Sequence, residues 1–208
     1  MTAARLLGAT PLVVALACAL PVAVEVSPSA EGRPIRSLAL APLEAGSGVR
    51  EAGAPGGRAA QVTGRLLEEL TRAGFEVIPP EEVSLALASG GSSGRPLGPA
   101  EMARLLSRQF RIDALVTGRL LRYRPRTGGS RGAERPASVW FSVRVYDLSG
   151  QVLWQGDYDE TQASVASRLD RFGLALSRRF EWLTADALIR YGAREIAVRL
   201  RRDLGTWS

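Results

Sequence analysis

Three acidic residues near the end of a predicted strand, Asp157, Asp159 and Glu160, are the side chains best suited to chemistry in this sequence. Side chains two positions apart on a strand point to the same face, so Asp157 and Asp159 could ligate calcium or form a carboxylate pair. No glycine-supported calcium loop surrounds them, and no third oxygen donor is evident. The simpler interpretation is a solvated strand end with Tyr158 packed inward. We therefore expect no metal site and no cofactor, and keep the three acids as weak candidates.

The residue types that the chain lacks exclude several classes of enzyme. All 27 basic residues are arginine, so there is neither lysine nor histidine. Schiff-base catalysis requires lysine, and histidine is the commonest general base. Several serines are present, but a hydrolytic triad cannot be built from them without such a base. The glycine-rich stretch GSGVREAGAPGG lacks the G-K-[ST] ending of a phosphate-binding loop. We therefore expect no enzymatic activity.

The positive charge of the chain does not by itself indicate nucleic-acid binding. The formal net charge is +6 and the isoelectric point is about 10.5, values that are common in proteins that bind nucleic acid. The arginines are spread along the chain and mixed with acids, as in Arg168, Asp170 and Arg171. This pattern is typical of solvated helix faces. No nucleic-acid partner is expected.

The first 17 residues have the features of a signal peptide. Arg5 supplies a positive charge, Leu6 to Leu16 is apolar, and the sequence ALA ending at Ala17 fits a small-x-small cleavage site. Prolines interrupt the apolar run and Glu25 ends it, which makes it a poor membrane-spanning helix. Cleavage is expected directly after Ala17.

The single cysteine, Cys18, follows this site at once. Small residues before a cysteine resemble a lipobox, the signal at which bacterial lipoproteins are acylated and cut, although Ala15 stands where leucine is usual. Lipidation would make Cys18 the first mature residue and the membrane anchor. The alternatives are an incidental cysteine in a secretory signal and an uncleaved anchor helix. Because Ala19 is not aspartate, the inner-membrane retention signal is missing and the periplasmic face of the outer membrane is expected. Residues 18–34 would be a lipidated tether.

Residues 35–208 are expected to form one periplasmic domain of the α/β (α+β) class. The runs SLALAPL, FEVIPP and IDALVTGRLLRYR predict strands that alternate with helices, which implies a parallel sheet with right-handed crossovers. The runs VWFSVRVYDL and QVLWQGDYDETQ, joined at Ser149-Gly150, predict an antiparallel hairpin. Helices are predicted over residues 163–180 and 185–203. The sheet is therefore mixed, with three parallel strands extended by an antiparallel hairpin, helices packed on it, and a helical carboxy terminus.

Two tryptophans of the predicted hairpin, Trp140 and Trp154, leave an alternative open. Counting outward from the turn brings them near each other, where they could stack on one face. They belong to the core if helices cover that face. If it is open, they form with Arg144 and Tyr146 a surface for a partner protein or a glycan.

The order of these motifs resembles that of a group of bacterial envelope lipoproteins and periplasmic domains. The resemblance rests on the A-P-L end of the first strand, on GFEV, on IDALVTGRL and on VRVYDLSGQVLW, and it covers residues 35–162. The group includes the curli secretion-channel lipoprotein, the lipoprotein activators of penicillin-binding proteins and the amino-terminal domain of TolB. The resemblance implies a small α/β domain that assembles in the periplasm with itself or with an envelope partner. The segments DETQ and WLTADAL look like those of a narrower set of uncharacterised lipoproteins.

The expected function is that of a non-catalytic, lipid-anchored periplasmic protein that binds or assembles with a cell-envelope component. Its partners would be the membrane, through the lipid, and an envelope protein or a second copy of the chain. The alternative is a metal- or carboxylate-dependent hydrolase of an envelope glycan that uses Asp157, Asp159 and Glu160. A pore is not expected, because the Gly- and Arg-rich loop 124–137 could not face lipid.

Overall fold

A computed structural model describes residues 22–30, 34–49, 57–90, 96–129, 133–161 and 183–205. These residues build a seven-stranded mixed sheet with the order β1-β9-β8-β5-β2-β4, and β3 pairs with β5 beside this path. The predicted signal peptide, Cys18 and the helix predicted over residues 163–180 lie outside the described residues. The predicted fold class, a mixed sheet with parallel and antiparallel parts and a carboxy-terminal helix, is confirmed.

One half of the sheet is parallel, as the alternation of strand and helix signals predicts. Strand β2 lies between β4 and β5 and pairs with both of them in parallel. The elements of this half, in chain order, are β2 (Ser37–Leu40), β3 (Glu44–Ala45), α1 (Gly57–Arg72), β4 (Glu76–Ile78), α2 (Pro80–Ser89), α3 (Pro99–Gln109) and β5 (Ala114–Arg124).

Helix boundaries in this half follow from local sequence. Pro80 and Pro99 open α2 and α3, at the position where a missing N–H costs nothing. Gly74 follows α1 with a φ of 89°, a conformation that glycine adopts without strain, and donates its N–H to the carbonyl of Thr71. The chain can therefore turn at once into β4.

The other half of the sheet is antiparallel and contains the predicted hairpin of β8 (Ser138–Tyr146) and β9 (Val152–Thr161). The turn is held by Asp147, whose Oδ1 accepts hydrogen bonds from the N–H groups of Ser149 and Gln151, each 2.9 Å long. The turn predicted at Ser149-Gly150 is thus confirmed. The short strands β6 (Thr127–Gly128) and β7 (Ala133–Arg135) form a small ribbon within the loop between β5 and β8.

A strand that the sequence did not predict, β1 (Val22–Val26), completes this half and is followed by a short 3-10 helix, η1 (Pro28–Ala30). Strand β1 pairs antiparallel with β9 and forms one edge of the sheet. These residues fall in the stretch expected to be a tether, and that expectation is wrong for β1. The reason is visible in the alternation: Val22 is buried in the core and Val24 packs against it, whereas Ala23 and Glu25 are exposed.

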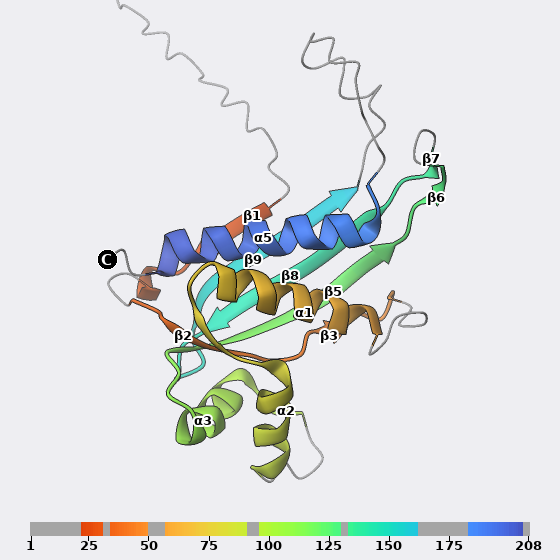
Figure 1. Cartoon of the computed structure of the whole chain (residues 1–208). Coiled ribbons are helices and arrows are strands. Elements are labelled where there is room, and N and C mark those ends of the chain that lie inside the picture. Colours follow the sequence, from red (N-terminus) through yellow and green to blue (C-terminus); the bar gives the residue numbers. More distant parts are fainter. Residues whose placement is uncertain are drawn as a thin grey trace, which may run out of the picture.

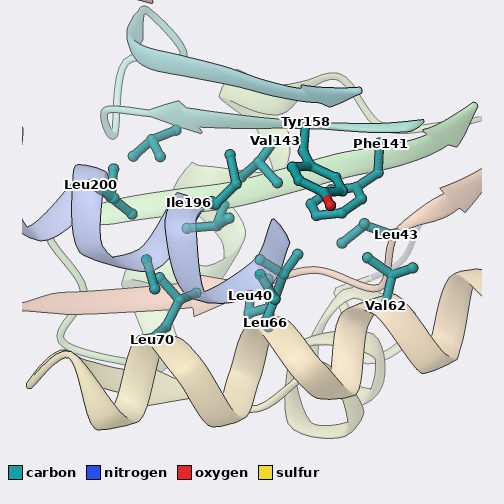
Figure 2. Packing of buried hydrophobic residues seen from close by; sticks show 14 of the residues in the cluster. Leu40, Leu43, Val62, Leu66, Leu70, Phe141, Val143, Tyr158, Ile196 and Leu200 are labelled. Carbon is teal, nitrogen blue, oxygen red and sulfur yellow. The ribbon is translucent and has the colours of Figure 1, made fainter. Parts of the chain in front are cut away.

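Helices α1 and α5 (Ala185–Leu204) lie side by side on one face of the sheet (Figure 1). Their apolar sides meet alternate residues of the strands in the larger hydrophobic core, part of which Figure 2 shows. Thr184 caps α5, because its side chain accepts a hydrogen bond from the N–H of Ala187. This core contains Leu38, Leu40, Leu66, Leu70, Val116, Phe141, Val143, Trp154, Tyr158, Ile189, Ile196 and Leu200.

Helices α2 and α3 pack on the opposite face, but they cover only the parallel half and its border. Ala39 and Leu115 lie under them, together with Val83 of α2 and Leu106 of α3. Tyr146, at the end of β8, is the residue of the antiparallel hairpin that joins this smaller core. The parallel strands are thus enclosed between two helical layers, whereas β8, β9 and β1 carry helices on one face.

Candidate functional site

The free face of the antiparallel half is the candidate functional site, and we call it the uncovered face. Strand alternation places its side chains opposite the α1 and α5 side of the sheet. Most of them are polar or charged, and all are exposed or half-buried. The uncovered face consists of Ala23 and Glu25 on β1, Thr117, Arg119 and Arg122 on β5, Trp140, Ser142 and Arg144 on β8, and Gln155, Asp157 and Asp159 on β9.

The two hairpin tryptophans lie on opposite faces, so the expectation that they stack on one face is wrong. Trp140 stands opposite Asp159, whereas Trp154 stands opposite Val145. Trp154 is fully buried in the core beneath α5, and its Nε1 donates a 3.1 Å hydrogen bond to Asp203 Oδ2. It holds β9 to the end of that helix.

The four residues predicted as a partner surface therefore divide into two pairs. Tyr146 is 8% exposed and lies in the smaller core near α3, so neither it nor Trp154 is available to a partner of the folded domain. Trp140 and Arg144 do share the uncovered face, and Trp140 is 36% exposed. Two of the four residues predicted as a partner surface are therefore exposed on one face.

Trp140 and Arg122 form the centre of a cluster at one end of the uncovered face. The guanidinium carbon of Arg122 lies 5.7 Å from the centre of the Trp140 ring, within the range of a cation–π contact. Arg122 also forms an ion pair with Asp159, and its Nε donates a 2.7 Å hydrogen bond to Ser138 Oγ. These contacts hold Trp140 and Arg122 in fixed positions, which is what a recognition surface requires.

The candidate carboxylates are tied into the same network. Asp157 and Asp159 share the uncovered face, as predicted, but Glu160 stands opposite Val139 on the other face. Asp159 is engaged by Arg122, and Asp157 accepts a 3.0 Å hydrogen bond from Gln155 Nε2. Gln155 Oε1 in turn accepts a 3.0 Å hydrogen bond from Arg144.

Metal chemistry has no support in this arrangement. Across the described ranges, no three or more histidine, cysteine, aspartate or glutamate side chains are grouped so that they could hold a metal ion. Asp159 instead pairs with Arg122 of β5, and Asp157 accepts a hydrogen bond from Gln155 on its own strand. The alternative of a carboxylate-dependent hydrolase therefore gains nothing from their geometry.

Charge is distributed unevenly over the uncovered face. Its basic side chains, Arg119, Arg122 and Arg144, lie on β5 and β8, and Glu44 of the neighbouring β3 forms an ion pair with Arg119. Its acidic side chains, Asp157, Asp159 and Glu25, lie on β9 and β1. The uncovered face therefore has a basic side, on β5 and β8, and an acidic side, on β9 and β1. The boundary between the two sides runs parallel to the strands.

Tyr158 shows how different the covered face is. Its side chain points inward, as predicted, and is fully buried, with its ring centre 5.3 Å from that of Phe141 (Figure 2). The hydroxyl has no hydrogen-bond partner within the described part of the chain. Burial, followed by the charge of Glu160, raises the pKa of Tyr158 well above its ordinary value. The group is thus a neutral packing residue.

The described residues define a class of fold: a mixed α/β sheet with one half enclosed between helices and the other half exposed on one side. No helix in the described ranges is long and apolar enough to cross a membrane. No known family profile matches the sequence, and no curated protein matches it either.

Solved structures do resemble the fold. A PelC dodecamer variant from Paraburkholderia phytofirmans matches with 13% identity over 89% of this chain and 98% of that chain, with a TM-score of 0.51. The lipoprotein GNA1162 from Neisseria meningitidis matches with 18% identity, 62% and 84% coverage, and a TM-score of 0.43. The LpoB C-terminal domain from Salmonella enterica matches with 16% identity, 64% and 89% coverage, and a TM-score of 0.41.

The resemblance predicted from the sequence motifs concerns the fold, and the PelC match supports it at that level. Identities this low say nothing of which residues act. What the chain does must therefore be argued from its own surface.

Proposed function

We propose that this chain is a non-catalytic periplasmic protein, anchored to the outer membrane by a lipid on Cys18, that assembles with a second copy of itself through the uncovered face. A second copy of the chain is the proposed occupant of the uncovered face. An envelope protein of different sequence is the competing occupant.

The observation that carries the proposal is the charge division of the uncovered face. In a pair related by a half-turn about an axis along the strands, β8 of one copy faces β9 of the other. The basic side of each copy then lies over the acidic side of its partner. A surface complementary to itself in this way fits a two-fold interface. Trp140, with Arg122 beside it, is the large aromatic anchor that such an interface needs.

Two further points support self-assembly and anchoring. PelC, whose fold this chain shares, is a dodecamer in its solved structure. Cys18 stands directly after the small residues that end the leader-like segment, and it is the single cysteine of the chain. If Cys18 is acylated, lipidation alone accounts for the single cysteine of the chain.

The test of assembly is photo-crosslinking in cells. A photoreactive amino acid replaces Arg144 on the uncovered face, and in a matched control it replaces Glu68, which is exposed on α1. We expect an adduct of twice the protomer mass from position 144 and none from position 68. Trp140→Ala should abolish the adduct, since losing a central aromatic anchor typically costs about 2 kcal/mol of binding or more.

Each result has a definite meaning. An adduct with a different protein would replace self-assembly by partner binding through the same face. No adduct from position 144 would overturn the proposal for this face. The anchor is tested separately by intact mass and membrane partition of wild type and Cys18→Ser; a mature protein without acyl chains would withdraw the anchor alone.

A further inference from the structure

The main sheet ends at β4 on one side and at β1 on the other, and the two edges differ in how they are protected. Strand β4 has three residues and is followed at once by Pro79 and Pro80, which cannot donate a hydrogen bond. Short length and proline are among the devices that block an edge. Strand β1 has five residues, no proline and no bulge in its pairing with β9. Of these two edges, β1 is the one that a further strand could join.

The backbone of β1 shows which of its groups face outward. The N–H of Ser27, directly after the strand, donates a 2.9 Å hydrogen bond to the carbonyl of Leu153 at β9. Backbone groups of an antiparallel strand alternate in direction, so those of Ala23 and Glu25 face β9 as well. The other three residues of the strand, all valines, therefore point their N–H and C=O groups away from β9. In the described part of the chain, no strand lies on that side.

The sequence of β1, VAVEV, is complementary to itself when two copies run antiparallel. With the junction centred on Val24, each valine stands opposite a valine of the second copy, and the valines are the residues whose backbone groups point outward. Each such pair exchanges two hydrogen bonds. Glu25 stands opposite Ala23, which avoids like charges directly opposite one another. A parallel pair in register would instead place the two Glu25 side chains next to each other.

Exposed apolar side chains beside β1 favour the same arrangement. Val26 is 46% exposed, and Tyr191 and Val198 of α5 are 51% and 54% exposed. Both α5 residues lie ~120–140° around the helix from Asp186, which accepts a hydrogen bond from Gln61 of α1. They are thus on the side of α5 away from α1, and α5 lies between α1 and β1 (Figure 1). An antiparallel pair of β1 strands would keep both α5 helices on one face of the joined sheet, with these sides turned toward each other.

We propose that β1 pairs antiparallel with β1 of a second copy and joins the two sheets into one, with Val24 at the centre of the junction. This contact differs from the one proposed through the uncovered face. There one sheet lies over another, whereas here the sheet is extended edge to edge by backbone hydrogen bonds. A chain with two such contacts can assemble more than two copies.

Disulfide crosslinking tests the register of the junction. The full chain carries Cys18→Ser, so that introduced cysteines are its only thiols, and two differently tagged copies carry Ala23→Cys and Glu25→Cys. In the proposed junction, positions 23 and 25 form a pair without hydrogen bonds, with Cα atoms ~4.5 Å apart, which a disulfide can bridge. Two copies of the same position lie diagonally, ~7–8 Å apart, beyond that range.

On mild oxidation of the mixed proteins, we expect the 23–25 disulfide to exceed each of the other two by about fivefold or more. Equal amounts of the three products would mean random collision. An excess of the 25–25 product would mean parallel pairing. Either result would overturn the proposal.

Charge at position 23 gives a second test, in the same unanchored chain with Trp140→Ala to remove the contact through the uncovered face. Ala23→Glu places a carboxylate opposite Glu25 of the second copy and should raise the dissociation constant about fivefold, whereas Ala23→Arg should lower it by a similar factor. The same two substitutions at Gln109, exposed on α3, should leave it unchanged. Sedimentation equilibrium measures the constants. No association in this background, or no such order, would overturn the β1 junction.

The two proposed contacts can fail separately. A 23–25 disulfide without the photo-crosslinked adduct at position 144 would leave the β1 junction standing and withdraw the contact through the uncovered face. An adduct at position 144 without the 23–25 disulfide would do the reverse.

Discussion

The two halves of the sheet differ in how they are covered, although they share one set of hydrogen-bonded strands. The parallel half lies between α1 on one side and α2 with α3 on the other, and Leu38, Ala39 and Leu40 of β2 form an apolar run that is buried on both faces. The antiparallel half lies under α5 on one side, and from Val139 to Val145 β8 alternates between buried apolar residues and exposed or half-buried ones. Parallel strands require helices on both faces, whereas antiparallel strands can leave one face exposed. In this chain the antiparallel half accordingly leaves one face without helices.

The largest expected difference between the two faces concerns their tryptophans. Trp154→Ala removes a fully buried ring and its bond to Asp203, so we expect the free energy of unfolding to fall by about 3–5 kcal/mol. Trp140→Ala, on the uncovered face, should cost less than about 1 kcal/mol. Urea unfolding of both variants measures the comparison. Equal losses would mean that the uncovered face is packed as the core is.

Alanine substitutions at two glycines should change the free energy of unfolding by smaller amounts, and in opposite directions. A Cβ at Gly192 in α5 would lie 2.5 Å from the Tyr158 ring, so Gly192→Ala should lower the free energy of unfolding by about 1 kcal/mol or more despite alanine's preference for helix. At Gly64 in α1 a Cβ meets open space, and Gly64→Ala should raise it by about 0.5–1 kcal/mol.

Thermal unfolding of the two glycine variants shows the sign directly. A gain in both would mean that α5 does not press against the sheet as closely as the structure describes. A loss at Gly64 would mean that the outer surface of α1 is covered.

The smallest expected effect is that of the Tyr158 hydroxyl. Tyr158→Phe removes a buried donor that has no partner in the described part of the chain, so near neutral pH the change should be within about 1 kcal/mol. The pH dependence is more informative. Because burial raises the pKa of Tyr158 above its value of about 10 in the unfolded chain, the folded state keeps the proton longer.

The sign follows from this difference in proton binding. The stability that neutral Tyr158 contributes is fully present below about pH 10 and is lost as the pH rises above that value, by up to about 1.4 kcal/mol per pH unit. Urea midpoints measured from neutral to strongly alkaline pH should fall less steeply in Tyr158→Phe than in the wild type. Identical slopes would place the hydroxyl in contact with water.

Local pattern was sufficient to predict most of the elements. The Ser149-Gly150 turn and the helix predicted over residues 185–203 rest on short-range signals, and both agree with the structure. The parallel order of β2, β4 and β5 followed from their alternation with helices. These features depend on neighbours within a few residues.

Features that depend on distant parts of the chain were missed. The alternation of Val22–Val26 fits a strand, but it does not show where that strand pairs, because the partner is β9, far along the sequence. The two tryptophans were assigned to one face, but Asp159, the partner of Trp140, lies an odd number of residues beyond Trp154, which puts them on opposite faces. Whether helices cover a face of the sheet is decided by tertiary packing. The periodicity of a strand does not predict it.

The position of β1 also sets an order of events for a newly made chain. A polypeptide emerges from its amino terminus, yet Val22–Val26 have nothing to pair with until Val152–Thr161 exist. The first strand of the sequence must therefore be among the last to join the sheet, a long-range closure of the kind that slows folding. During that delay Val22–Val26 are not yet paired with β9, and the hydrophobic core that Val22 joins stays open at this edge of the sheet.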